Sequence, residues 1–184
     1  MGHRAHYIGT IMAIIVEGFD NAGKSTLARS FGLEIVHPGP RPATQLEESF
    51  CLSGQALDCS RRIVMDRVTS ISTPCYSGHF KSIYRQCLDA MLNQPRCVLI
   101  YCRPPLEVIK DFSNHIAKSY DDETKIKWLH DNAEAIVSRY DLYMSVFPHV
   151  KYDYTRPDEG LRQMALQAQS SVEAWNTWKS LTQR

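Results

Sequence analysis

The 184-residue chain is predicted to fold as a three-layer α/β domain, in which a parallel sheet of about five strands has helices on both faces. Two observations lead to this prediction. Short apolar runs, typical of strands buried in a parallel sheet, alternate along the chain with segments whose apolar residues recur every three or four positions. The length suits a single domain, 1–184, with a core large enough to need neither disulfides nor a structural metal.

The expected strands begin with the apolar, β-branched run 11–16, which is followed by four more such segments: 33–37, 62–67, 97–102 and 150–154. Between them, helical patterns are predicted in five segments: 24–31, 44–60, 76–92, 126–143 and 159–178. Gly32 is expected to end the first helix. The three prolines and one glycine between His37 and Pro42 break any regular geometry and predict a loop where the second strand ends.

Charge and cysteine content narrow the class of protein. The formal net charge is only +1, so no global field exists to hold a long nucleic acid. The six cysteines form no Cys-x-x-Cys pair and no zinc-site spacing, and we interpret them as reduced thiols. No stretch approaches the roughly 18 apolar residues of a membrane-spanning helix, so we expect a cytoplasmic protein without a membrane partner.

The segment 18–25 reads Gly-Phe-Asp-Asn-Ala-Gly-Lys-Ser and lies between the first predicted strand and helix. The pattern Gly-x-x-x-x-Gly-Lys-Ser in that context predicts a phosphate-binding loop (P-loop). Glycines let backbone amides wrap the phosphates of ATP, Lys24 reaches the β- and γ-phosphates, and Ser25 is placed to bind Mg²⁺. The residues expected to contact ATP are Gly18, Asn21, Ala22, Gly23, Lys24, Ser25 and Thr26. The motif therefore predicts an ATP-dependent phosphotransferase of the P-loop NTPase fold.

The residues around this motif resemble the thymidylate kinase family, which opens with Glu-Gly-x-Asp-x-x-Gly-Lys-Ser/Thr, as residues 17–26 do here. The pair Asp66-Arg67 stands in the place of that family's Asp-Arg-Tyr/Phe motif, although Val68 replaces the aromatic residue. The resemblance implies that Asp20 contacts the acceptor's sugar 3′-hydroxyl, Arg67 holds the acceptor phosphate and Asp66 lies near the metal. With Lys24 these are the predicted catalytic residues. A structural ion pair between Asp66 and Arg67 is the alternative interpretation.

Three other residues follow the ends of predicted strands, which border the ligand crevice in parallel sheets. His37 and Arg41, after the second strand, are predicted to contact the acceptor. Arg156 follows the last strand, where kinases of this architecture commonly pack the adenine. The aromatic residues Tyr76 and Tyr84 lie near the acceptor side, but aromatics at helical spacing are more often core.

Some thymidylate kinases carry an arginine in the loop position that Asn21 occupies here, whereas others supply positive charge from a mobile lid. By the same logic the transition-state charge would be met by Arg103 or by a lid at roughly 113–127. That segment carries Lys118, Lys125 and Lys127, and none of the three is singled out by spacing.

The acceptor is predicted from the loop after the second strand. A monophosphate is already a competent nucleophile, whereas a hydroxyl acceptor needs a base to receive its proton. Deoxynucleoside kinases usually place a glutamate in this loop, but the segment 37–40 contains no carboxylate. The sequence therefore favours a deoxynucleoside monophosphate kinase, acting on a small pyrimidine nucleotide. Monomer and homodimer both stay open.

Two alternatives remain. The compact length and the departures from the family motifs also resemble bacteriophage proteins that phosphorylate unusual pyrimidines or hydroxymethyl groups in DNA. For such a hydroxyl acceptor, Asp66 or His37 would be the general base. The protein would then act in the host cytoplasm, with long nucleic acid as a partner. The second alternative is a P-loop nucleotide switch, against which the absence of the guanine motif Asn-Lys-x-Asp argues.

Overall fold

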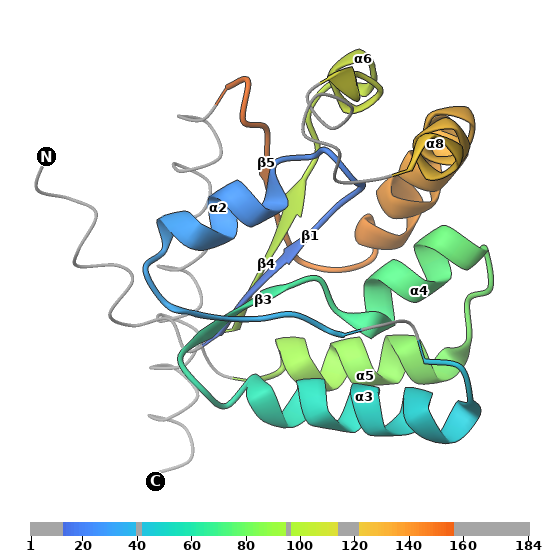
Figure 1. Ribbon diagram of the computed structural model, residues 1–184. Coiled ribbons are helices and arrows are strands. Elements are labelled where there is room, and N and C mark those ends of the chain that lie inside the picture. Colours follow the sequence, from blue (N-terminus) through green and yellow to red (C-terminus); the bar gives the residue numbers. More distant parts are fainter. Residues whose placement is uncertain (1–12, 40–41, 95–96, 114–121, 157–184) are drawn as a thin grey trace, which may run out of the picture.

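A computed structural model describes residues 13–39, 42–94, 97–113 and 122–156, which form an α/β fold around one sheet (Figure 1). The five strands are β1 (Ala13–Glu17), β2 (Glu34–Val36), β3 (Ile63–Asp66), β4 (Cys97–Cys102) and β5 (Val150–Tyr152). They lie in the order β2-β3-β1-β4-β5, and every neighbouring pair is parallel. The predicted five-stranded parallel sheet is confirmed.

The described helices are α2 (Lys24–Ser30), α3 (Gln45–Asp58), α4 (Thr69–Ser77), α5 (Ser82–Leu92), α6 (Leu106–Ile109) and α8 (Glu123–Met144). Helices α3, α4, α5 and α8 lie on one side of the sheet and α2 lies on the other (Figure 1). Successive β1 side chains serve the two faces in turn: Ile15 joins the core beneath the four helices, whereas Ile14 packs with Leu27 of α2. Helices on both faces are thus confirmed. No described helix is long and apolar enough to cross a membrane.

The strand order places the site. The chain runs from β1 outwards to β2, returns to β3, and then crosses to β4 on the other side of β1. In parallel α/β sheets, ligands bind beyond the carboxyl ends of the strands at such a change of direction. Residues that follow β1 and β3 therefore meet at one edge of the sheet.

The structure differs from the sequence-based prediction in one stretch. The helix predicted for 76–92 is confirmed only in part: α5 covers 82–92, whereas a separate helix, α4, covers 69–77 and residues 78–81 are not helical. Gly78 separates them with a φ of 76°, a left-handed conformation that ends α4. Helix α4 was missed because its sequence is rich in Ser and Thr and contains Pro74, all poor helix formers. The helix predicted for 159–178 lies outside the described residues.

Candidate active site

The segment 18–23 joins β1 to α2 and has the backbone geometry of a tight loop. Gly18, Asn21 and Gly23 have positive φ values of 142°, 62° and 80°. A Cβ on Gly18 would lie 2.4 Å from the backbone oxygen of Cys102, so only glycine fits against the end of β4. A Cβ on Gly23 would lie 2.8 Å from the ring of Tyr154. The loop therefore packs closely against the end of β4 at Gly18 and against Tyr154 at Gly23.

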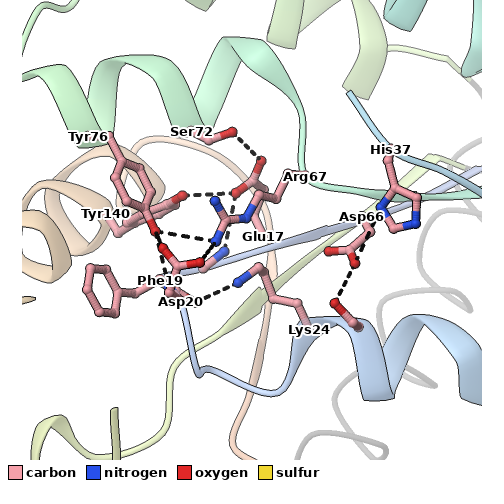
Figure 2. A network of polar contacts seen from close by, with 12 residues as sticks. Glu17, Phe19, Asp20, Lys24, His37, Asp66, Arg67, Ser72, Tyr76 and Tyr140 are labelled. Atoms are coloured by element: carbon pink, nitrogen blue, oxygen red, sulfur yellow. Dashed lines mark hydrogen bonds and ion pairs between the residues drawn. The ribbon is translucent and has the colours of Figure 1, made fainter. Parts of the chain in front are cut away.

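Lys24 begins α2 and is buried. Its Nζ donates to the backbone oxygen of Phe19 at 2.6 Å, so the ammonium lies inside the loop (Figure 2). Burial, followed by the nearby charge of Arg67, lowers the pKa of Lys24 to about 8, against the opposing attraction of Asp20. A buried ammonium group in this position is suited to bind the phosphates of a nucleotide, whose oxygens would replace the water that Lys24 has lost.

Ser25 and Asp66 bring two oxygen ligands together. The Ser25 hydroxyl donates to Asp66 Oδ2 at 2.7 Å, and the Asp66 side chain is buried at the end of β3. A hydroxyl beside a carboxylate fits Mg²⁺, which is usually bound by few protein oxygens together with water and phosphates. No cluster of three or more His, Cys, Asp or Glu able to hold a metal occurs in the described part of the chain.

Asp20, Arg67 and Tyr76 form a hydrogen-bonded cluster beside the loop (Figure 2). Arg67 Nη2 donates to Asp20 Oδ1 at 2.7 Å, and the Tyr76 hydroxyl donates to Asp20 Oδ2 at 2.5 Å. Burial alone would raise the pKa of Asp20, but the charges of Arg67 and Lys24 and the two hydrogen bonds lower it to about 2. Asp20 is therefore ionised at neutral pH and is a poor proton acceptor.

Asp66 and Arg67 are adjacent in the sequence, but their side chains contact different partners. Asp66 contacts Ser25 and lies 3.8 Å from His37 Nδ1, whereas the ion pair of Arg67 is with Asp20. The neighbours along the chain therefore point to different partners, and an Asp66–Arg67 ion pair is not what the structure shows.

A pocket of about 150 Å³ opens next to this cluster, between β2, β3 and α3. Its polar lining includes Arg67 and His37, both predicted to contact the acceptor, and Gln55 and Asp58 of α3. Gln55 is buried, and its amide is held by Thr69, which donates N–H to Oε1 at 2.9 Å and accepts from Nε2 at 3.0 Å. The sequence analysis missed Gln55; the available signal was a polar residue three positions after Leu52 on the buried face of α3.

Asn21 and Arg156 are two further residues that the sequence predicts to contact ATP. The Asn21 Nδ2 group points to the end of α6, where it contacts the carbonyl oxygens of Val108, Ile109 and Asp111 at 3.2, 3.3 and 2.6 Å. Asn21 thus ties the loop to 108–111, and only its backbone amide is left for phosphates. Arg156 is exposed, whereas Tyr154, two residues earlier, packs on Gly23.

The expected sources of lid charge are only partly described. Arg41 and Lys118 lie outside the described residues. Arg103 is bound to Asp141 through Nε and Nη2 at 3.0 to 3.2 Å. Lys127 pairs with Asp131, one turn further along α8, at 2.6 Å. The guanidinium of Arg103 is therefore committed to α8 rather than directed at the loop.

Comparison with known proteins places the fold. No family model matches the chain, and no curated protein matches its sequence. Among solved structures, the YorR protein of Bacillus subtilis in complex with phosphorylated GDP has a TM-score of 0.57 and 17% identity, covering 90% of this chain and 98% of that one. A gluconokinase from Sinorhizobium meliloti 1021 has a TM-score of 0.55 and 14% identity, covering 88% and 95%.

Polyphosphate kinase 2 from Arthrobacter aurescens TC1 is similar at a TM-score of 0.54 and 11% identity, covering 86% of this chain and 65% of that one. The similarity extends over most of the chain, while the identities are low. It shows that this chain shares the fold of these proteins, two of which are named as kinases.

Proposed function

We propose that this chain is an ATP-dependent, Mg²⁺-dependent kinase that transfers the γ-phosphate to a deoxynucleoside monophosphate, with a pyrimidine as the expected base. The observation that carries the proposal is the Asp20–Arg67 ion pair. Asp20 belongs to the phosphate-binding loop and Arg67 lines the neighbouring pocket, so the pair joins a donor site to an acceptor site. The kinase fold supports the general activity.

The chemistry of Arg67 favours a phosphate on the acceptor. Its side-chain hydrogen bonds to the described residues, Asp20 and Tyr76, both come from Nη2. Nε and Nη1 are thus left for other acceptors, and phosphate oxygens are suited to accept charge-assisted hydrogen bonds from them. Asp20, ionised and adjacent, is suited to accept a hydrogen bond from a sugar hydroxyl.

Each loop residue has a part in the proposed transfer. The backbone amides of the loop and Lys24 bind the donor phosphates, while Ser25 and Asp66 would hold the metal. Bound there, Mg²⁺ neutralises charge on the transferring phosphoryl group. Arg67 orients the acceptor phosphate, whose oxygen is already anionic, so that no protein group has to take a proton. This agrees with the low pKa of Asp20.

One contact favours the second candidate, a kinase of a hydroxyl acceptor. His37 Nδ1 lies 3.8 Å from Asp66 Oδ2, and His37 lines the pocket. An imidazole next to a carboxylate could receive the proton of a nucleoside or hydroxymethyl acceptor. Long nucleic acid would be a partner only in that case.

Incubation with γ-labelled ATP and Mg²⁺ tests both candidates against deoxynucleoside monophosphates, deoxynucleosides and DNA containing hydroxymethylpyrimidines. Label on a monophosphate is the expected result; label on a nucleoside or on DNA would replace the first proposal with the second. ATP consumption without label on any acceptor would contradict both and favour a nucleotide switch.

Two variants and a matched control sharpen this assay. Arg67→Ala should raise the KM of the acceptor about ten- to hundredfold and that of ATP much less, because hydrogen bonds to a charged group contribute about 1.5–3 kcal/mol. Arg85→Ala is the matched control, since Arg85 is exposed on α5 and should leave both KM values unchanged. His37→Asn should slow transfer to a hydroxyl acceptor far more than transfer to a monophosphate. Equal effects of Arg67→Ala on both substrates would remove its acceptor role.

A further inference from the structure

Glu17 is a fully buried carboxyl group at the point where β1 enters the phosphate-binding loop. An ionisable group in that position is costly unless hydrogen bonds compensate for the loss of water. The proposed reaction uses neither of its oxygens, so the surroundings of this side chain call for a separate explanation.

Three firm donors converge on the Glu17 carboxylate from different parts of the fold (Figure 2). Oε1 accepts from Val68 N–H at 2.5 Å. Oε2 accepts from Gly18 N–H at 3.2 Å and from the hydroxyl of Tyr140, on α8, at 3.1 Å. The Ser72 hydroxyl lies 3.5 Å from Oε1 but donates at 2.8 Å to the Val68 carbonyl, so its contribution is weak.

The Val68 amide matters because it directly follows Arg67. Arg67 has a φ of 78°, a left-handed conformation that is uncommon for a residue with a long side chain. Its own N–H donates to the Val16 carbonyl at 3.0 Å, and the next N–H donates to Glu17. Two anchors on β1 thus hold the strained residue from either side.

We propose that Glu17 is a positioning residue for the acceptor: its ionised carboxylate fixes the backbone of Arg67, so that the guanidinium stays between Asp20 and the acceptor pocket. This inference rests on the proposed function. Protonated Glu17 would present an O–H to a site already filled by donors, so one of the three contacts would be lost and Arg67 would be held less firmly.

The charges around Glu17 set the pH range of this effect. Burial raises the pKa of Glu17 to about 7, against the opposing effects of the Val68 N–H and the charges of Arg67 and Lys24. The other titratable groups that face it are neutral near pH 7, because burial raises their pKa: Cys75 of α4, Cys102 of β4 and Tyr140 of α8. Acceptor affinity should therefore rise with pH through about 7.

Stability should change in the opposite direction. The folded pKa of Glu17 lies above its ordinary value of 4.5, so folding favours the protonated form. The contribution of Glu17 to stability is thus fully present below about pH 4.5 and is lost as the pH rises towards 7. If Glu17 had only a structural role, acceptor binding would not improve over the pH range in which ionisation of Glu17 lowers the stability of the fold.

The test compares acceptor KM, ATP KM and thermal stability between pH 5.5 and 8.5 for wild type and three variants. Tyr140→Phe removes one donor to the carboxylate and should move the Glu17 limb of the acceptor profile up by about half to one pH unit. Glu17→Gln should abolish that limb and raise acceptor KM about tenfold at pH 8, with ATP KM changed less. Ser72→Ala is the matched control and should follow wild type.

The acceptor phosphate itself titrates near pH 6, so the readout is the difference between variants that share one acceptor. Coincident profiles for wild type and Tyr140→Phe would overturn the role of Glu17, as would equal effects of Glu17→Gln on both substrates. If Glu17→Gln does not fold, the Tyr140→Phe comparison decides. Absence of transfer by wild type to every acceptor would instead overturn the proposed function and, with it, this inference.

Discussion

Replacing Lys24 with methionine should abolish phosphoryl transfer and at the same time stabilise the ligand-free protein. The Lys24 ammonium is buried in its own loop, and its pKa is lowered from 10.5 to about 8. The unfolded chain therefore binds this proton more tightly than the folded chain does. The difference between 10.5 and about 8, at about 1.4 kcal/mol per pH unit, amounts to roughly 3 kcal/mol against folding at pH 7.

Methionine keeps most of the buried volume and removes the charge. It also removes the hydrogen bond to the Phe19 carbonyl, which offsets about 1 kcal/mol of the gain. The net stabilisation should be about 2 kcal/mol, or roughly 4–8 °C in Tm for a chain of this length. Because the folded pKa is the lower one, the advantage should be full below about pH 8 and disappear between about pH 8 and 10.5.

Urea unfolding of wild type and Lys24→Met at pH 7 and pH 10 measures both parts of this prediction. Lys127→Met is the matched control, since Lys127 is exposed on α8 and its solvent-screened pair with Asp131 should contribute little to stability. A variant less stable than wild type at pH 7, or an advantage unchanged at pH 10, would refute the argument from burial. Retained transfer would refute the role of Lys24 in the reaction.

Three further substitutions, one of them with a matched control, test the loop and its surroundings. Gly18→Ala should lower Tm by more than about 10 °C and abolish ATP binding, because the added Cβ would lie 2.4 Å from the backbone oxygen of Cys102. Gly54→Ala in α3 is the matched control: the added Cβ would meet nothing within 4 Å, so this change should stabilise the protein by about 0.5–1 kcal/mol. Asn21→Gly tolerates the positive φ but removes the contacts to 108–111, and urea unfolding should show a loss of about 1–3 kcal/mol. Tyr76→Phe should raise acceptor KM severalfold without changing ATP KM, as steady-state kinetics would show.

The central strands β1, β3 and β4 could be predicted because nearly all of their residues are buried, which leaves a largely apolar run in the sequence. β1 and β4 are such runs, and all five β1 residues are buried. Helix α8 could be predicted from its stripe, of which Ile126, Leu129 and Tyr140 are buried members. Helix α4 could not, because tertiary packing of Ile71 and Cys75 stabilises a segment whose local propensity is low.

Some residues of the candidate site could likewise be predicted from the sequence, whereas others could not. Lys24 and Ser25 belong to one motif with fixed spacing, and the family resemblance implies that Asp66 lies near the metal. The structure places the Ser25 hydroxyl 2.7 Å from Asp66 Oδ2. The contacts of Tyr76 with Asp20 and of Tyr140 with Glu17 join residues 56 and 123 positions apart, so no local pattern reveals them. Sequence reasoning can therefore name the atoms that meet the substrate more readily than those that hold them in place.

The charges around the loop limit how the proposed reaction can be completed. In the described structure Arg67 is neutralised by Asp20, and Lys24 is the remaining cation at the loop. A donor triphosphate and an acceptor phosphate would add several negative charges to a site whose next arginine along the sheet, Arg103, is bound to Asp141. Under the proposed function, Mg²⁺ held by Ser25 and Asp66 would offset part of this negative charge, because phosphoryl transfer depends on neutralising the transferring group.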